Sequence, residues 1–169
     1  MNSFYSNGKL LLTAEYIVLD GAKSLALPTK FGQSLEVKKI SNPQVQWKSY
    51  NSNNELWFEA TFSLDTLQPL EVNPTSERLQ SILNTAKELN KDFLRDKNGF
   101  EISTRLDFPN NWGLGSSSTL INNIADWANI DAFALLEKTF GGSGYDIACA
   151  SNDSAILYQI EASNKIVSP

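Results

Sequence analysis

The chain contains no histidine, which removes several common kinds of active site before any motif is considered. Serine–histidine–aspartate and cysteine–histidine catalysis both need an imidazole, as do histidine-ligated zinc sites and every general base made from histidine. Acid–base chemistry in this protein must therefore come from Asp, Glu, Lys or Tyr side chains.

Cysteine is nearly absent as well, since Cys149 is the only one among 169 residues. A single thiol cannot form an internal disulfide, which fits a reducing compartment. Its neighbours Ile147, Ala148 and Ala150 are apolar, so we expect Cys149 to be a buried packing residue and not a nucleophile. No apolar run reaches the length of a membrane span and no signal-peptide pattern begins the chain, so we expect a cytoplasmic protein with no membrane partner.

Positive charge is scarce and dispersed along the chain. The 14 Lys and Arg residues are outnumbered by 19 Asp and Glu residues, which gives a net charge of −5 without any basic cluster. Nucleic acid is therefore a poor partner by the electrostatic criterion. With 41% apolar residues the chain can bury a core, and its length suits a single domain that spans residues 1–169.

The hydrophobic pattern predicts several strands in the first third of the chain. Residues 8–13 are expected to form a buried strand, and residues 16–19 form a second apolar segment. Apolar and polar residues then alternate through three further predicted strands, which contain Leu35, Val45 and Leu56.

Helices dominate the second half of the predicted order. Apolar residues from Leu79 to Leu94 recur at helical spacing, with Ser76 as the expected N-cap and Asn98-Gly99 as the expected end of the helix. Further helices are predicted at residues 119–128, 132–140 (after Asp131) and 147–150, with strands at 100–107 and 154–160. Hairpin strands followed by grouped helices indicate an α+β sandwich.

Residues 109–119 lie between a strand-like run and a helix-like run. Gly113 and Gly115 let backbone N–H groups approach a ligand closely, and a helix start supplies unpaired N–H donors at the positive end of its dipole. The serines at 116–118 add hydroxyls that can bond phosphate oxygens or ligate a hard cation. Serine is also a common N-cap, so the segment alone leaves a phosphate site and an ordinary helix start equally open. It has neither the Gly-Lys-Ser/Thr ending of a Walker A loop nor G-x-G-x-x-G.

The pattern Pro-x-x-x-Gly-Leu-Gly-Ser-Ser at 109–117 resembles the ATP loop of the GHMP kinases. That family includes galactokinase, homoserine kinase, mevalonate kinase and phosphomevalonate kinase. Its members usually continue with Ala-Ala where this chain has Ser118-Thr119. Both replacements are small, so close packing at these two positions is retained.

Two further segments are similar to motifs of the same family, in the same order along the chain. Residues 8–21 resemble the N-terminal motif of the mevalonate and phosphomevalonate branch, with Asn7 in place of a proline and Ala14 in place of a glycine. Tyr16 leans toward phosphomevalonate-type members. Residues 141–146, Gly-Gly-Ser-Gly-Tyr-Asp, resemble the stretch that carries the catalytic aspartate of mevalonate kinases.

The resemblance implies a role for each matching residue. The ATP phosphates would lie against the loop residues Gly113, Leu114, Gly115, Ser116, Ser117 and Ser118. Asp146 would be the catalytic base, and Lys9 would lie beside the acceptor hydroxyl and the transferring phosphoryl group. Glu15 and Tyr16 would line the acceptor pocket. Magnesium would be ligated by Ser117 and Glu137.

Some of these residues also have an ordinary structural interpretation. Lys9 can be a lysine at a strand start whose charge stays in water, and Asp146 can complement the dipole of a helix N-terminus. Glu137 fits such an account less well, because a carboxylate in the last turn of a helix opposes the dipole, although Lys138 offsets it.

The resemblance implies the ribosomal protein S5 domain 2-like sandwich, a mostly antiparallel sheet with helices on one face. It also implies the N-terminal, catalytic half of a kinase that uses ATP and magnesium to phosphorylate a small metabolite, with mevalonate or phosphomevalonate as the preferred acceptor. A diphosphomevalonate decarboxylase-like enzyme and a catalytically silent binding domain remain alternatives. The family's C-terminal domain is absent from this chain, so we expect exposed apolar surface, a homodimer that covers it, or inactivity of the chain alone.

Overall fold

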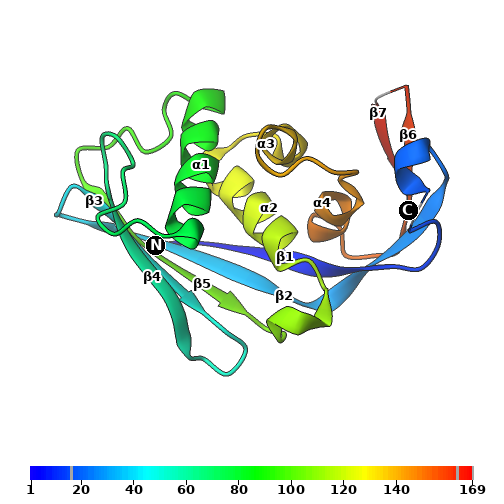
Figure 1. Cartoon of the computed structure of the whole chain (residues 1–169), viewed down its shortest axis with the longest axis horizontal. Helices are drawn as coiled ribbons and strands as arrows, with labels where there is room; N and C mark the ends of the chain where they lie inside the picture. The colour runs from blue at the N-terminus through cyan, green and yellow to red at the C-terminus, as the bar shows by residue number, and fades with distance from the viewer. Residues whose placement is uncertain (16, 163, 169) are drawn as a thin grey trace.

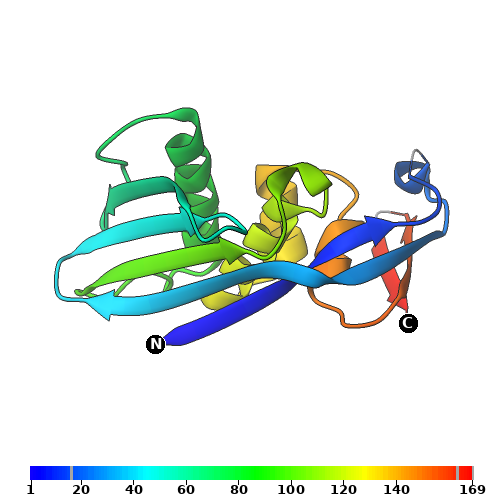
Figure 2. The same cartoon turned by 90° about the horizontal axis from the view of Figure 1, so that it is seen from below.

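One mixed sheet carries the α-helices of the described residues on a single face (Figures 1 and 2). The structure is a computed structural model that describes residues 1–15, 17–162 and 164–168. The strands within those ranges are β1 Asn2–Leu11, β2 Ser24–Ile40, β3 Gln44–Tyr50, β4 Leu56–Ser63, β5 Gly99–Leu106, β6 Ile156–Glu161 and β7 Asn164–Ser168. The helices there are α1 Pro74–Leu89, α2 Ser116–Ala128, α3 Ala132–Thr139 and α4 Tyr145–Ala150, with short 3-10 turns η1 Val18–Asp20 and η2 Asn110–Trp112.

The long strand β2 organises the sheet. Its C-terminal part pairs with β5 and its N-terminal residues pair with β6, while β1 pairs along most of its length. The strand order is β4-β3-β5-β2-β6-β7, with β1 also bonded to β2. Every described pairing is antiparallel except that of β3 with β5, which is parallel. Figure 2 shows β2 running along the length of the molecule.

Two hydrophobic clusters hold the helices against this sheet. The larger one joins the strands β2, β3, β4 and β5 with the helices α1, α2 and α3 and with Ile147 of α4. Its fully buried members include Leu35, Phe62, Leu83, Ile102 and Ile121. The smaller one, at the other end of β2, contains Val18, Ala26, Ala148, Cys149, Ile156 and Tyr158. The predicted burial of Cys149 is confirmed, because its exposed fraction is 0%.

Helix α1 begins three residues earlier than predicted. Asn73, not Ser76, is the N-cap, and its side chain accepts hydrogen bonds from the backbone N–H groups of Thr75 and Ser76 at 3.0 and 2.9 Å. The Ser76 hydroxyl accepts a bond in return from the Asn73 N–H, which completes a capping box, and Pro74 occupies the first helical position. The prediction took the wrong member of this reciprocal pair as the cap.

The predicted end of α1 is also wrong. The helix ends at Leu89 with Asn90 as its C-cap, well before Asn98-Gly99. Phe93 and Leu94 are buried as expected, but they belong to the turns after the helix, where Leu94 has a φ of 57°. Apolar spacing therefore persisted beyond the helix because the following turns pack against the same core.

Other boundaries shifted as well. The strand predicted at 8–13 is β1, which starts at Asn2, ends at Leu11 and leaves Leu10 46% exposed. Helix α2 starts at the first serine of the loop and not at 119, and the final strand is followed by a second one, β7, that the pattern did not predict.

The architecture nevertheless confirms the predicted α+β class, with a mostly antiparallel sheet and helices on one face. None of the helices in the described ranges is long and apolar enough to cross a membrane. Exposed apolar side chains occur near the β1–β2 connection and on β6 and β7, namely Leu10, Leu12, Ile17, Leu19, Leu157, Ile166 and Val167. Which partner covers them stays a prediction.

Candidate active site

Glycines give the loop between β5 and α2 its shape. Gly113 and Gly115 have φ values of 69° and 85°, in the left-handed region that favours glycine. Gly115 is the N-cap of α2, and no described side chain caps this helix. The N–H groups of its first turn are therefore available to an anion at the positive end of the helix dipole.

Strand β1 passes directly beside this loop. The backbone N–H of Lys9 donates to the carbonyl oxygen of Leu114 at 2.9 Å. A Cβ on Gly115 would lie 3.1 Å from Cγ of Lys9, and a Cβ on Gly8 would lie 3.0 Å from the same carbonyl of Leu114. The absence of side chains at positions 8 and 115 therefore permits the strand and the loop to approach this closely.

Helix α4 brings Asp146 to the same place from the other direction. The Ser118 hydroxyl in the first turn of α2 donates a hydrogen bond to the Asp146 carboxylate, 28 residues later in the chain. Nζ of Lys9 lies 5.3 Å from the centre of the Tyr145 ring. The structure thus joins the loop, Lys9 and Asp146 in one half-buried cluster, whose catalytic roles stay predictions.

The pKa of the Cys149 thiol depends on its burial and on the charged groups near it. Burial raises its pKa to about 12; the neighbouring Asp146 carboxylate also raises it, whereas the Lys9 ammonium lowers it. Both charged groups are therefore close to one buried atom. A thiol with this pKa is almost entirely protonated at neutral pH, which agrees with the predicted packing role of Cys149.

A buried polar network fixes α2 to the sheet. The Ser6 hydroxyl on β1 donates to the Asn123 side chain at 2.9 Å and accepts from Asn122 at 3.0 Å, while Asn123 also donates to the backbone carbonyl of Gln33 at 2.8 Å. All four residues are less than a tenth exposed. The sequence interpretation did not identify this network, because polar residues inside a helix give no sign of the partner that they reach across the fold.

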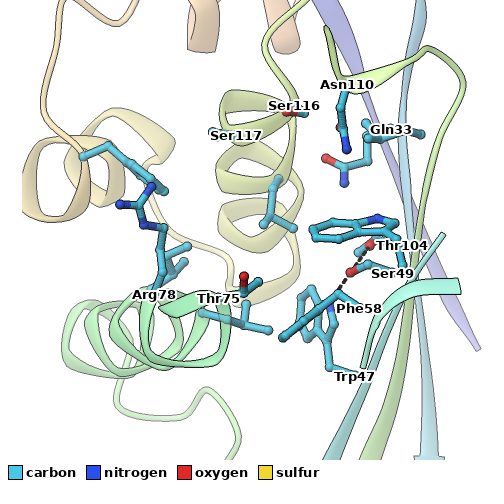
Figure 3. Close-up of a pocket in the computed structure, with 16 residues that line it drawn as sticks. Gln33, Trp47, Ser49, Phe58, Thr75, Arg78, Thr104, Asn110, Ser116 and Ser117 are labelled. Atoms are coloured by element: carbon cyan, nitrogen blue, oxygen red, sulfur yellow. Dashed lines mark hydrogen bonds between the residues drawn. The ribbon is translucent and has the colours of Figure 1, made fainter. Parts of the chain in front are cut away.

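A cavity of about 230 Å³ opens beside the same loop. It lies between α1, the start of α2 and the helix-facing side of the sheet (Figure 3). The residues around it are Gln33, Trp47, Ser49, Trp57, Phe58, Thr75, Arg78, Leu79, Ile82, Thr104, Leu106, Asn110, Ser116, Ser117, Leu120 and Phe140. The sequence interpretation missed this cavity, since alternating aromatic residues on strands look the same whether they fill a core or line a pocket.

Arg78 enters the cavity wall from α1, opposite the sheet (Figure 3). Its guanidinium carbon lies 5.3 Å from the centre of the Phe140 ring. No carboxylate within the described ranges forms an ion pair with it. A guanidinium that stacks on an aromatic ring and has no anionic partner is suited to an anionic or aromatic ligand.

The other described residues that were predicted for the site make fewer contacts with the loop, Lys9 and Asp146. Ser117 is exposed at the cavity, and Glu137 is on the surface, where Nζ of Lys165 is 4.0 Å from its carboxylate. Glu15 is exposed in the turn after β1, and Tyr16 lies outside the described residues. Within the described part of the chain no three His, Cys, Asp or Glu side chains group as metal ligands, so a hard cation would need ligand oxygens from its substrate.

No model of a protein family matches the sequence, and no curated protein matches it. Solved structures do match. Mevalonate kinase from L. major, in complex with R-mevalonate, superposes with a TM-score of 0.66 at 16% identity over 100% of this chain and 52% of that chain. A D-glycero-D-manno-heptose 1-phosphate kinase from Bacteroides thetaiotaomicron superposes with a TM-score of 0.70 at 17% identity, over 99% of this chain and 58% of that chain. Phosphomevalonate kinase from Streptococcus pneumoniae, in complex with phosphomevalonate and AMPPNP, superposes with a TM-score of 0.66 at 19% identity, over 94% of this chain and 50% of that chain.

These similarities confirm the kind of fold that the motifs implied. The chain has the fold of about half of these small-molecule kinases, since it is covered almost completely while it spans 50 to 58% of their length. At 16 to 19% identity the likeness concerns the fold alone.

Proposed function

We propose that this chain binds a nucleoside triphosphate and carries the groups that transfer its terminal phosphoryl group to a small metabolite. One observation carries this proposal. The hydrogen bond from Ser118 to Asp146 places a carboxylate beside the uncapped start of α2, where phosphate oxygens are expected to bind. A carboxylate that merely balanced the dipole of its own helix would not need to face a second helix start.

The two sides of the α2 start then have different tasks. On one side, the cavity lined by Trp47, Trp57 and Phe58 can hold the nucleoside, with the phosphates on the loop at 113–118. On the other side, Lys9 and Asp146 face the acceptor: the ammonium lies beside the transferred group, and the carboxylate accepts the proton of the acceptor hydroxyl. Positioning and charge neutralisation dominate such reactions, and both come from groups on rigid elements.

The hydroxyl of Ser117 and the carboxylate of Glu137 fit the oxygen chemistry that magnesium prefers. Neither side chain makes a hydrogen bond within the described residues, and the Lys165 contact of Glu137 is at the 4.0 Å limit of an ion pair. We therefore propose that the Ser117 hydroxyl and the Glu137 carboxylate, the latter in exchange for its long Lys165 contact, would hold magnesium together with phosphate oxygens. Bound there, the ion would neutralise charge on the triphosphate.

The acceptor is a small metabolite with a hydroxyl or phosphate group. The N-terminal and Asp146 motifs support mevalonate or phosphomevalonate, since they resemble that branch most. The structural neighbours include kinases named for mevalonate, phosphomevalonate and a heptose 1-phosphate, so the fold alone supports all three classes. Glu15 and Tyr16 are the residues proposed to distinguish them.

Nucleotide binding is the first test, because the chain spans only about half of the matched kinases. Calorimetric titration of the full chain with magnesium and AMPPNP is expected to show saturable binding. Turnover is then measured with mevalonate, phosphomevalonate, homoserine and sugars. Carbon dioxide release with diphosphomevalonate would favour the decarboxylase alternative, whereas no nucleotide binding, by this chain or by one joined to a second domain, would favour a silent binding domain.

A further inference from the structure

Asn7 joins the strand that carries Lys9 to the helix that carries Asp146. Its side-chain amide nitrogen donates to the backbone carbonyl oxygen of Asn152 at 2.8 Å and to the carboxylate of Asp153 at 2.9 Å. A carboxamide nitrogen has two protons, and here each proton has an acceptor. Both partners are acceptors, so the amide group cannot be turned the other way round without losing both bonds.

The first of these acceptors, Asn152, is bonded to the last turn of α4. Its backbone N–H donates to the carbonyl oxygen of Cys149 at 3.2 Å, and its side-chain amide donates to that of Ala148 at 2.8 Å. Asn152 therefore moves with the helix, so a bond to its carbonyl oxygen is a bond to the end of α4. A helix of six residues has few internal hydrogen bonds and depends on such contacts for its position.

The two ends of α4 are attached to different strands. Before the helix, the hydroxyl of the buried Tyr158 on β6 donates to the carbonyl oxygen of Ser143. After the helix, Asn7 attaches the chain to β1, and no other hydrogen bond among the described residues joins β1 to α4 or to the residues that follow it. The contact of Lys9 with the Tyr145 ring also crosses this interface, but it uses the side chain that has to be positioned.

Asn7 is also the last residue of β1 before its pairing with β2 becomes irregular. It lies opposite Gly32, whereas Lys9 lies opposite Pro28, so three residues of β2 oppose one residue of β1 between these two pairs. Such an irregularity disrupts the ladder locally, and the regular register does not continue to Lys9. A side-chain attachment two residues before the lysine fixes the strand at the point where the ladder does not.

We propose that Asn7 is a positioning residue, which sets the distance between Lys9 and Asp146 by attaching β1 to the end of α4. This role rests on the proposed function, in which the ammonium and the carboxylate act on the same acceptor. The N-terminal motif that this chain resembles has a proline at position 7, which has no side-chain amide and could form neither bond. Asn7 makes no hydrogen bond to the loop at 113–118 among the described residues, so its loss should slow the transfer and leave nucleotide affinity unchanged.

The experiment compares Asn7→Ala with the wild type on the full chain. Turnover is expected to fall ~3–10-fold, the effect of one lost hydrogen bond, while calorimetry gives an unchanged affinity for magnesium and AMPPNP. Hydrogen exchange of the backbone N–H groups should become faster in α4 and in the residues that follow it. The control is Asn42→Ala, which removes an exposed amide that donates to Gln44 at 2.9 Å, in the turn between β2 and β3 at the other end of the molecule (Figure 1). This variant should match the wild type in turnover and in the exchange of α4.

A second variant tests whether Asn7 acts through its partners. Asp153→Ala removes one of the two acceptors and is expected to lower turnover less than Asn7→Ala does. The double variant should be no slower than Asn7→Ala alone, because the attachment is already lost. Losses that multiply in the double variant would show that the two residues act separately and would overturn the proposal.

Two further results would also overturn it. One is a folded Asn7→Ala protein with the turnover of the wild type, and the other is a loss of nucleotide affinity as large as the loss of turnover, which would indicate a general effect on the fold. Failure of the proposed function is distinct, since the wild type itself would then transfer no phosphoryl group. Hydrogen exchange decides in that case: faster exchange confined to α4 and the residues after it would support the attachment by Asn7, and unchanged exchange would refute it.

Discussion

The ammonium group of Lys9 lies 5.3 Å from the centre of the Tyr145 ring, and Tyr145 immediately precedes Asp146 in the chain. An ammonium ion at this distance is attracted to the negative face of the ring by about 0.5–1 kcal/mol or more. The ring therefore holds the Lys9 charge close to the carboxylate and the loop. This contact links the start of α4 to β1, and it gives Tyr145 a positioning role.

Replacement of Tyr145 by leucine is expected to weaken binding of magnesium and AMPPNP by ~3–10-fold, which corresponds to the loss of the attraction between the cation and the ring. Tyr145→Phe keeps the ring and should bind as the wild type does. Calorimetric titration of both variants measures the difference. If the phenylalanine variant were as weak as the leucine variant, the ring would not be what positions Lys9.

Asp146→Asn is expected to lower turnover by roughly 10²–10⁴, the usual contribution of a general base. Asparagine still offers an oxygen to the Ser118 hydroxyl, so the change removes the charge and leaves the loop geometry in place. Steady-state kinetics with the acceptor that the wild type phosphorylates provide the measurement. Asp65→Asn, which alters an exposed carboxylate far along the chain, is the control. Full activity of the Asp146 variant would remove this residue from the chemistry.

Gly113→Ala and Gly115→Ala form a matched pair. Both glycines have a positive φ, so each alanine should cost about 1–2 kcal/mol of stability. Only at position 115 would the new methyl group also meet another side chain, Cγ of Lys9 at 3.1 Å, whereas nothing lies within 4 Å at position 113. We expect similar free energies of unfolding in urea but a clearly weaker nucleotide affinity for the Gly115 variant. Equal affinities would show that Lys9 adjusts without consequence.

The three short motifs predicted which distant residues lie together better than the hydrophobic pattern predicted the bounds of the helices and strands. Glycines and a helix start fix a local geometry by themselves, so the loop at 113–118 could be identified from the sequence. That Lys9 and Asp146 join it depends on contacts between residues distant in the chain, 28 residues apart for Ser118 and Asp146 and more for Lys9 and Leu114, and only the resemblance to a family supplied that information. The bonds that realise it, from Lys9 to Leu114 and from Ser118 to Asp146, have no local signature.

The aromatic cavity could not be predicted at all. Trp47 and Phe58 follow the same alternation as ordinary core residues, and whether a space remains between them and α1 depends on how the helix packs. The prediction of the α1 N-cap failed for a simpler reason. The side chains of Asn73 and Ser76 each accept a hydrogen bond from the backbone N–H of the other residue. Both residues are typical of a helix start, so the sequence pattern does not show which one is the N-cap.

Cys149 should make the protein less stable in alkali. Its pKa is about 12 in the folded state against an ordinary value of 9.0, so above pH 9 the unfolded chain loses this proton first and binds fewer protons than the folded one. Stability therefore falls as the pH rises from 9 to 12, by up to about 1.4 kcal/mol per pH unit from this group. Urea unfolding of the wild type and of Cys149→Ala at pH 8 and pH 10 measures the contribution. An equal loss of stability in both proteins would contradict it.

Ala14 occupies a conformation that favours glycine. Its φ is 64°, and its carbonyl oxygen accepts hydrogen bonds from the N–H groups of Ile17 and Val18 at 3.1 and 2.8 Å, which closes the turn after β1. The related motif has glycine at this position, so the chain keeps the turn although its residue is strained there. The strain of an L-residue in the left-handed region is about 1–2 kcal/mol.

Ala14→Gly is therefore expected to raise the free energy of unfolding by about 0.5–1 kcal/mol, because relief of the strain exceeds the extra entropy that glycine gives the unfolded chain. Ala22→Gly, eight residues later at a position without positive φ, should show only the entropic loss and lower the stability. Urea unfolding monitored by tryptophan fluorescence measures both variants. Destabilisation by both glycines to the same extent would mean that the turn at Ala14 is not left-handed in solution, and the position proposed for Glu15 beside the acceptor would then lose its structural basis.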